Sequence, residues 1–202
     1  MTVSIFNVNN GRGTCEMKIA VFCTAVLALA SSTAIAQKSV SVPLTLTDSK
    51  WGYSLSVPSG WRYTIRAGLN PQNQRGPGTC IDLFPEGQNP VITVCGRPKR
   101  TDMNAIDSEL RASVNSHLTQ YGKFYSGFSL RPGSEQTRRV AERAALSAVF
   151  DYSSASQAFI EYMTWVQSEA LRVNIAVRTP RDADQIMIRK DLAAVISSVR
   201  LP

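Results

Sequence analysis

Histidine is the side chain used most often in acid–base catalysis, and the chain contains one histidine, His117. A hydrolase of the Ser-His-Asp or Cys-His type needs a nucleophile beside that base and a third group that orients it. The sequence has no Gly-x-Ser-x-Gly motif, no His-Glu-x-x-His motif and no glycine-rich phosphate loop. One imidazole cannot build a metal site that needs several. The sequence therefore predicts no cofactor and no metal site, and we expect His117 on the surface or flank of a helix.

Three carboxylates, Asp82, Glu161 and Glu169, are the remaining candidates for catalysis. Two of them could serve as an acid and a base, as they do in glycosidases. Their positions in the sequence do not show that any two converge in space. The prediction is therefore that the chain is not an enzyme, and a small carboxylate-based hydrolase is the alternative from another functional class.

The chain has four cysteines: Cys15, Cys23, Cys80 and Cys95. The first two lie in an amino-terminal segment that we expect to be removed. Cys80 and Cys95 each stand four residues outside Phe84 and Val91, which flank a predicted turn, so they would face each other across a hairpin. In an oxidising compartment such a pair indicates a disulfide. A redox-active or metal-binding pair is the competing interpretation, and it lacks both Cys-x-x-Cys spacing and a neighbouring histidine.

Met17–Ala36 contains the three parts of a secretory signal peptide. Lys18 supplies the positive charge, Ile19–Ala30 is an apolar run of twelve residues broken by one threonine, and Ala34-Ile35-Ala36 fits a signal peptidase. Twelve apolar residues are too few for a membrane-spanning helix, which needs about 20. We predict cleavage before Gln37 and a periplasmic location, with secretion as the alternative.

Translation that starts at Met17 would make residues 1–16 a mis-assigned upstream extension. Residues 37–202 would then form one mature α+β domain with no transmembrane segment. This part keeps 20 of the 22 basic and 14 of the 15 acidic residues, an excess of six positive charges. The basic residues are scattered, which is typical of a solvated surface; an acidic partner or an anionic envelope surface is the alternative.

A loop is expected over Ala67–Thr79, which is rich in Gly, Pro, Asn and Gln. Long loops often bind partners, and Arg75 in this loop, together with Arg97 or Arg100, could make charge-assisted contacts with an acidic partner. These three arginines are the candidate binding residues. The alternative is that the loop is only a flexible connection.

Two long helices and several short strands are predicted from apolar periodicity. One helix spans 102–121 behind a Thr101 or Asp102 cap, and the other spans Pro180–Ser198 behind a Thr179 cap with Asp182 in a capping box. The expected strands are residues 40–46, 53–57, 61–65, 80–84, 91–95, 124–130, 135–140, 144–152, 158–166 and 171–177. Short hairpins between strands, with a helix after each block, predict a largely antiparallel sheet flanked by helices.

Both faces of the strand Ala158–Val166 are largely apolar. Phe159, Met163 and Trp165 would share one face, and Tyr162 would lie on the other, because side chains alternate along a strand. This favours a central strand covered by helices on both sides. An aromatic platform for a ligand is the alternative.

The segment Gly52-Tyr53-Ser54-Leu55-Ser56-Val57-Pro58-Ser59-Gly60-Trp61, together with the order of elements, resembles the Mog1/PsbP-like superfamily, which includes DcrB-like bacterial envelope proteins. The resemblance spans most of residues 48–200. It implies an α/β/α sandwich around an antiparallel sheet, used mainly for binding and assembly, and it brings no catalytic residues. In this segment Pro58 and Gly60 would make a turn, and Tyr53 and Trp61 would enter the core.

These observations together predict a non-enzymatic periplasmic protein that binds a partner or assists an assembly. An immunity or inhibitor protein that neutralises a toxin or an enzyme is the alternative within binding. The expected partner is another envelope or secreted protein, and no nucleic acid is expected.

Overall fold

The computed structural model describes residues 37–202 except 70–74, 87–89 and 99–105. The expected signal peptide and upstream extension therefore lie outside the described residues. The main sheet has nine antiparallel strands in the order β1-β4-β5-β6-β11-β10-β9-β7, with β8 also paired to β9. Its strands are β1 (Lys38–Ser39), β4 (Arg62–Leu69), β5 (Arg75–Phe84), β6 (Ile92–Pro98), β7 (Ser126–Leu130), β8 (Gln136–Val140), β9 (Arg143–Ser154), β10 (Gln157–Gln167) and β11 (Leu171–Pro180).

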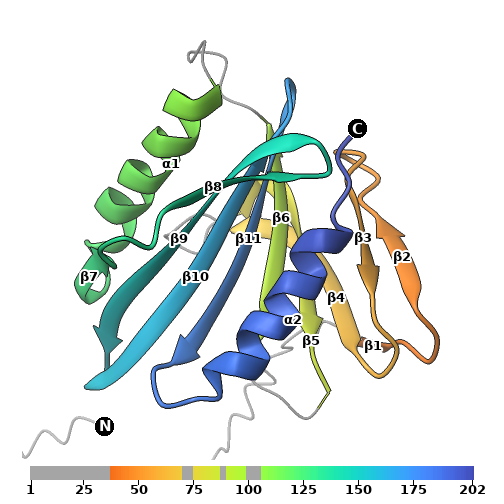
Figure 1. Cartoon of the computed structure of the whole chain (residues 1–202). Coiled ribbons are helices and arrows are strands. Elements are labelled where there is room, and N and C mark those ends of the chain that lie inside the picture. The colour runs from red at the N-terminus through yellow and green to blue at the C-terminus, as the bar shows by residue number, and fades with distance from the viewer. Residues whose placement is uncertain (1–36, 70–74, 87–89, 99–105) are drawn as a thin grey trace, which may run out of the picture. The chain divides into compact units, whose positions relative to one another are not determined.

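One helix lies on each face of this sheet, because each strand presents alternate residues to opposite sides. The helix α1 (Ile106–Tyr121) packs Leu110 and Val114 over the β7, β9 and β10 part of the sheet. The helix α2 (Gln185–Ser198) covers the other face, beside the hairpin β2 (Leu44–Thr47) and β3 (Ser54–Val57) (Figure 1). The predicted α+β sandwich with a largely antiparallel sheet is confirmed.

The centre of the sheet is β10, which pairs along its length with β9 and β11. Trp165 is 2% exposed on the α1 side, and Tyr162 is buried on the α2 side. The expected central strand, covered on both faces, is therefore confirmed.

The turn predicted at Pro58 and Gly60 also forms. Tyr53 and Trp61 are buried in the main core, and Gly60 has a φ of +84°, which side chains with a Cβ rarely adopt. The edge of the Tyr53 ring packs against Gly96, which has no side chain. A Cβ atom at this position would lie 2.6 Å from Tyr53 Cε1. Tyr53 can therefore pack directly against the sheet.

Three predicted boundaries are wrong. The strand expected at residues 40–46 forms only from Leu44, as β2, because the chain bonds to the main sheet up to Val40, next to β1, and then leaves it to reach the separate β2–β3 hairpin. The loop expected at Ala67–Thr79 is shorter, because Ala67 pairs with Thr79 and Leu69 with Arg75, with a register shift between the two pairs. Hydrogen bonding across the hairpin outweighs the weak strand propensity of its Gly and Pro residues.

The third error concerns the start of α2. Thr179 and Pro180 belong to β11, where they pair with Ile160 and Phe159, so they are not available to begin a helix. Asp184 caps the helix instead, and its carboxylate accepts hydrogen bonds from the backbone N–H groups of Ile186 and Met187 at 3.0 and 3.1 Å.

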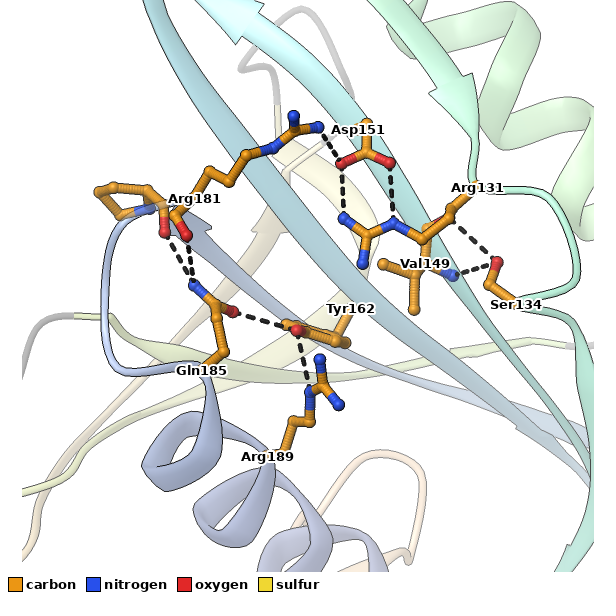
Figure 2. A network of polar contacts seen from close by, with 9 residues as sticks. Arg131, Ser134, Val149, Asp151, Tyr162, Arg181, Gln185 and Arg189 are labelled. Atoms are coloured by element: carbon orange, nitrogen blue, oxygen red, sulfur yellow. Dashed lines mark hydrogen bonds and ion pairs between the residues drawn. The ribbon is translucent and has the colours of Figure 1, made fainter.

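A polar network on the α2 side of the sheet ties the residues that follow β7 and β11 to β9 (Figure 2). Asp151 accepts two hydrogen bonds from Arg131, at 2.9 and 2.7 Å, and one from Arg181 at 2.7 Å. Nearby, Tyr162 donates to Gln185 and accepts from Arg189, which joins β10 to α2. The Arg131 hydrogen bonds, helped by Arg181, hold the pKa of Asp151 below its usual value of 3.8.

We expect Asp151→Asn to lower the free energy of unfolding at neutral pH by about 1 kcal/mol, since the pair is partly exposed and screened. Because the folded-state pKa is lowered, the stabilisation is complete above the unfolded-state pKa and is lost as the pH falls through the folded-state value. Urea denaturation at about pH 7 and about pH 3 measures the difference. If the difference in free energy of unfolding between Asp151→Asn and the unaltered protein increased at low pH, this assignment would be contradicted.

Candidate binding groove

The helix α1 covers only part of its face of the sheet, and a groove of about 890 Å³ lies beside it. One wall is α1, from Ser113 to Tyr121, and the floor is formed by β4, β5, β6, β11 and β10. This volume is within the range of natural ligand sites, about 300–1,000 Å³. The strand registers place the floor residues in rows that cross the sheet.

The middle row runs from β10 to β4. It contains, in order of pairing, Trp165, Asn174, Cys95, Cys80 and Arg66. Cys80 and Cys95 form the predicted disulfide, directly opposite each other in the predicted register. Trp165 and both cysteines are buried beneath the surface of the groove.

Asn174 stands between these two apolar groups. Its side-chain oxygen Oδ1 is buried, and within the described residues it has no hydrogen-bond partner. A buried acceptor without a partner costs free energy.

A row of positive charge lies next to the middle row. Arg172 on β11 is directly opposite Arg97 on β6, on the face that carries α1. Arg172 also donates from Nη1 to Ser113 Oγ of α1 at 2.7 Å. Arg97 and Arg172 therefore form one cross-strand pair at this end of the groove.

The other two candidate binding residues, Arg75 and Arg100, lie largely outside the residues that the structure describes. Arg75 begins β5, but its side chain lies outside the described residues, and so does the whole of Arg100. Of the three, the structure places Arg97 alone in the groove; its role in binding stays a prediction.

The opposite end of the groove holds a buried polar triad. Glu161 is fully buried; its Oε2 lies 2.9 Å from His117 Nε2, and its Oε1 accepts a hydrogen bond from Arg178 Nε at 2.7 Å. Burial raises the pKa of Glu161, but the contacts with His117 and Arg178 outweigh burial and leave the pKa lowered. An ionised carboxylate only accepts, so His117 Nε2 carries the proton.

Aromatic rings complete the surroundings of this triad. The Arg178 guanidinium lies 4.7 Å from the centre of the Tyr121 ring and 5.8 Å from that of Tyr125, in cation–π geometry. The expectation that His117 lies at the surface is wrong, since it is 8% exposed and packs against Tyr121, Phe150 and Trp165. The cause is Glu161 on the facing strand, which gives the imidazole a buried partner.

The carboxylate of Asp82 also has an arginine as its counter-ion. It forms an ion pair with Arg66 and accepts a hydrogen bond from Thr93 Oγ1 at 2.8 Å. Glu169 is exposed in the turn between β10 and β11. Asp82 and Glu161 therefore each serve as the counter-ion of an arginine, and the three carboxylates considered for catalysis occupy different environments.

Sequence reasoning missed Arg66, Arg172, Asn174 and Arg178 as residues of a site. A signal for three of them was present: Arg172, Asn174 and Arg178 alternate with buried Val173, Ile175 and Val177 on β11. Polar residues on one face of a strand in the middle of a sheet indicate that this face borders solvent or a cavity.

The geometry and the comparisons define a class of fold rather than a family. No protein-family model and no curated protein matches the chain. The architecture is the Mog1/PsbP-like fold that the sequence predicted, and two solved structures share it. In the part of the chain that the structure describes, no helix is long and apolar enough to cross a membrane, and no three potential metal ligands cluster.

The first of these structures is cyanobacterial PsbP (CyanoP) from Synechocystis sp. PCC 6803. It has 12% sequence identity and a TM-score of 0.57, over 81% of this chain and 95% of that one. The second is LpqN of Mycobacterium tuberculosis, a protein involved in cell envelope biogenesis. It has 17% identity and a TM-score of 0.50, over 83% and 91% of the two chains.

Proposed function

We propose that the protein is a non-enzymatic binding protein of the bacterial envelope, and that the groove beside α1 holds part of its partner. The observation that carries this proposal is the groove itself, an open cavity of about 890 Å³ lined by polar and aromatic residues on one face of the sheet. Preformed cavities of this size with a few polar groups are typical binding sites.

The location in the envelope rests on two further observations. The amino-terminal segment has the pattern of an export signal, and the Cys80–Cys95 disulfide is typical of proteins outside the cytoplasm. The structural similarity to LpqN, a protein involved in cell envelope biogenesis, points the same way.

The carboxylates favour binding over hydrolysis. A general acid must keep a raised pKa and reach the substrate. Glu161 has a lowered pKa and no exposed surface, and Asp82 is occupied by Arg66. The proposal would be overturned if the protein hydrolysed a substrate and Glu161→Gln or Asp82→Asn abolished this hydrolysis while the variant stayed folded.

A bulky side chain placed in the groove should block binding. Ser116 lines the groove from α1, so we expect Ser116→Trp to reduce capture of partners from an envelope extract by at least about tenfold, because steric exclusion removes most of the contact surface. Asn115→Trp is the matched control, because Asn115 is exposed on the same helix and does not line the groove. Quantitative mass spectrometry of the captured proteins measures both. Equal capture by the two variants would show that the groove is not the site.

A further inference from the structure

The most exposed large apolar side chain among the described residues lies on the first turn of α2. It is Ile186, which is 85% exposed, and the adjacent Met187 is 43% exposed. The backbone N–H groups of both residues donate to the carboxylate of Asp184, so the helix cap fixes this turn. An apolar side chain with so much surface in water gains free energy when that surface is removed from water.

Two cations accompany Ile186 on the exposed side of α2. Lys190 follows Ile186 by four residues, so the two side chains are neighbours on the helix surface, and Arg189 precedes Lys190. Both cations are exposed, and neither forms an ion pair with a carboxylate of the described residues. Arg189 donates from Nε to the hydroxyl of Tyr162 at 3.1 Å, a partner without the negative charge of a carboxylate. Their positive charges are therefore not neutralised within this part of the chain.

The acidic residues near this turn are engaged or lie on other sides of it. Asp191, the sole acidic residue of α2, is half-buried beside Pro85, and burial raises its pKa. Asp184 accepts the hydrogen bonds of the helix cap, and Asp182 lines the groove on the α1 face of the sheet. The exposed side of α2 is therefore apolar and basic.

This surface has the features of a membrane contact rather than of a protein interface. The other exposed positions of α2 are the small residues Ala193, Ala194 and Ser197, and α2 lies on the outside of the sheet (Figure 1). A protein interface is organised around a large, well-packed apolar centre, which such a helix surface does not provide. A bilayer accepts single protruding apolar side chains, while lysine and arginine extend their aliphatic stems and keep their charges at the headgroups.

We propose that α2 docks the protein on an anionic lipid surface, with Ile186 and Met187 inserted below the headgroups and Arg189 and Lys190 in contact with them. The excess of positive charge in residues 37–202 acts in the same direction. The helix lies on the face of the sheet opposite the groove, so this inference goes beyond the proposed function and does not depend on it. The groove would stay open to a partner while α2 contacts the membrane.

Sedimentation of the purified protein with large unilamellar vesicles tests this inference. One set of vesicles contains phosphatidylcholine alone, and the other contains phosphatidylcholine mixed with anionic phosphatidylglycerol. We expect the protein to sediment with the anionic vesicles and not with the neutral ones. Ile186→Ser should weaken this binding about tenfold, the effect of no longer burying a large apolar side chain. Lys190→Gln should weaken it about fivefold through the loss of one charge near the lipid surface.

Phe124→Ser and Lys123→Gln are the matched controls. Phe124 is 51% exposed, Lys123 is also exposed, and both lie in the turn after α1. Both variants should bind the anionic vesicles as the unaltered protein does. Ile186→Trp should bind at least as tightly as the unaltered protein, because tryptophan is favoured at the interface of a bilayer, whereas a protein pocket shaped for isoleucine would reject it.

Absence of binding to the anionic vesicles, or equal binding to the neutral ones, would overturn the inference. Equal weakening by the α2 variants and by the two controls would overturn it as well, because any exposed apolar or basic residue would then suffice. Loss of binding in Ile186→Trp would contradict insertion into a bilayer. Ser116→Trp should leave vesicle binding unchanged, so failure of the lipid inference and failure of the proposed function are measured separately.

Discussion

Glu161→Gln is expected to lower the free energy of unfolding by about 3 kcal/mol at neutral pH, the effect of removing one member of a buried charged set. Glu161 is fully buried and binds His117 and Arg178 with its two oxygens. In Gln an NH₂ group replaces one of these two acceptor oxygens. Its N–H groups would face the N–H donor of His117 or of Arg178. Arg178 would also lose its counter-ion, so both effects act in the same direction.

The pH dependence of this effect follows from the lowered pKa of Glu161. The stabilisation is complete above its ordinary pKa of 4.5 and is lost as the pH falls through the folded-state value, where the carboxylate takes up a proton. The difference between Glu161→Gln and the unaltered protein should therefore shrink at low pH.

Urea denaturation over a range of pH values measures both effects, and Glu169→Gln is the control. Glu169 is exposed, so its substitution should change stability by less than about 0.5 kcal/mol. Equal stability of Glu161→Gln and Glu169→Gln at neutral pH would show that the buried triad contributes nothing to folding.

Loss of the disulfide is the second large effect. The Cys80–Cys95 bond joins residues 15 positions apart, and closing a loop of that length stabilises a fold by about 3 kcal/mol, largely by restricting the unfolded chain. We expect the double variant Cys80→Ala/Cys95→Ala to be less stable by that amount. Its hairpin should still form, since β5 and β6 are also held by their backbone pairing.

Denaturation with and without a reducing agent separates the disulfide from side-chain packing. Reduction should lower the denaturation midpoint of the unaltered protein and leave that of the double variant unchanged. Free thiols at both positions in non-reduced peptide mapping of the isolated protein would contradict the bond, and an equal effect of reduction on both proteins would contradict its contribution to stability.

The sequence alone determined the features that depend on neighbours in the chain. The turn between β5 and β6 set the register that joins Cys80 to Cys95. The helix predicted over 102–121 is present as α1 over Ile106–Tyr121 and ends at Gly122 as expected, while its predicted cap at Thr101 or Asp102 lies outside the described residues. Such local patterns were enough for the class of fold.

Tertiary structure decided which polar residues meet. His117 and Glu161 are 44 residues apart, and their contact exists because α1 docks across β9 and β10. The start of α2 was decided in the same way, since pairing of Thr179 with Ile160 outweighs a local capping pattern.

The groove is also a product of docking, because α1 packs over β7, β9 and β10, and the groove lies beside it along β11, β6 and β5. No pattern along the chain records how far a helix extends across a sheet, because the free energy of docking comes from apolar area shared by segments distant in sequence. The sequence could therefore predict the sheet and its hairpins, while the burial of the Glu161 triad and the position of the groove were set by packing.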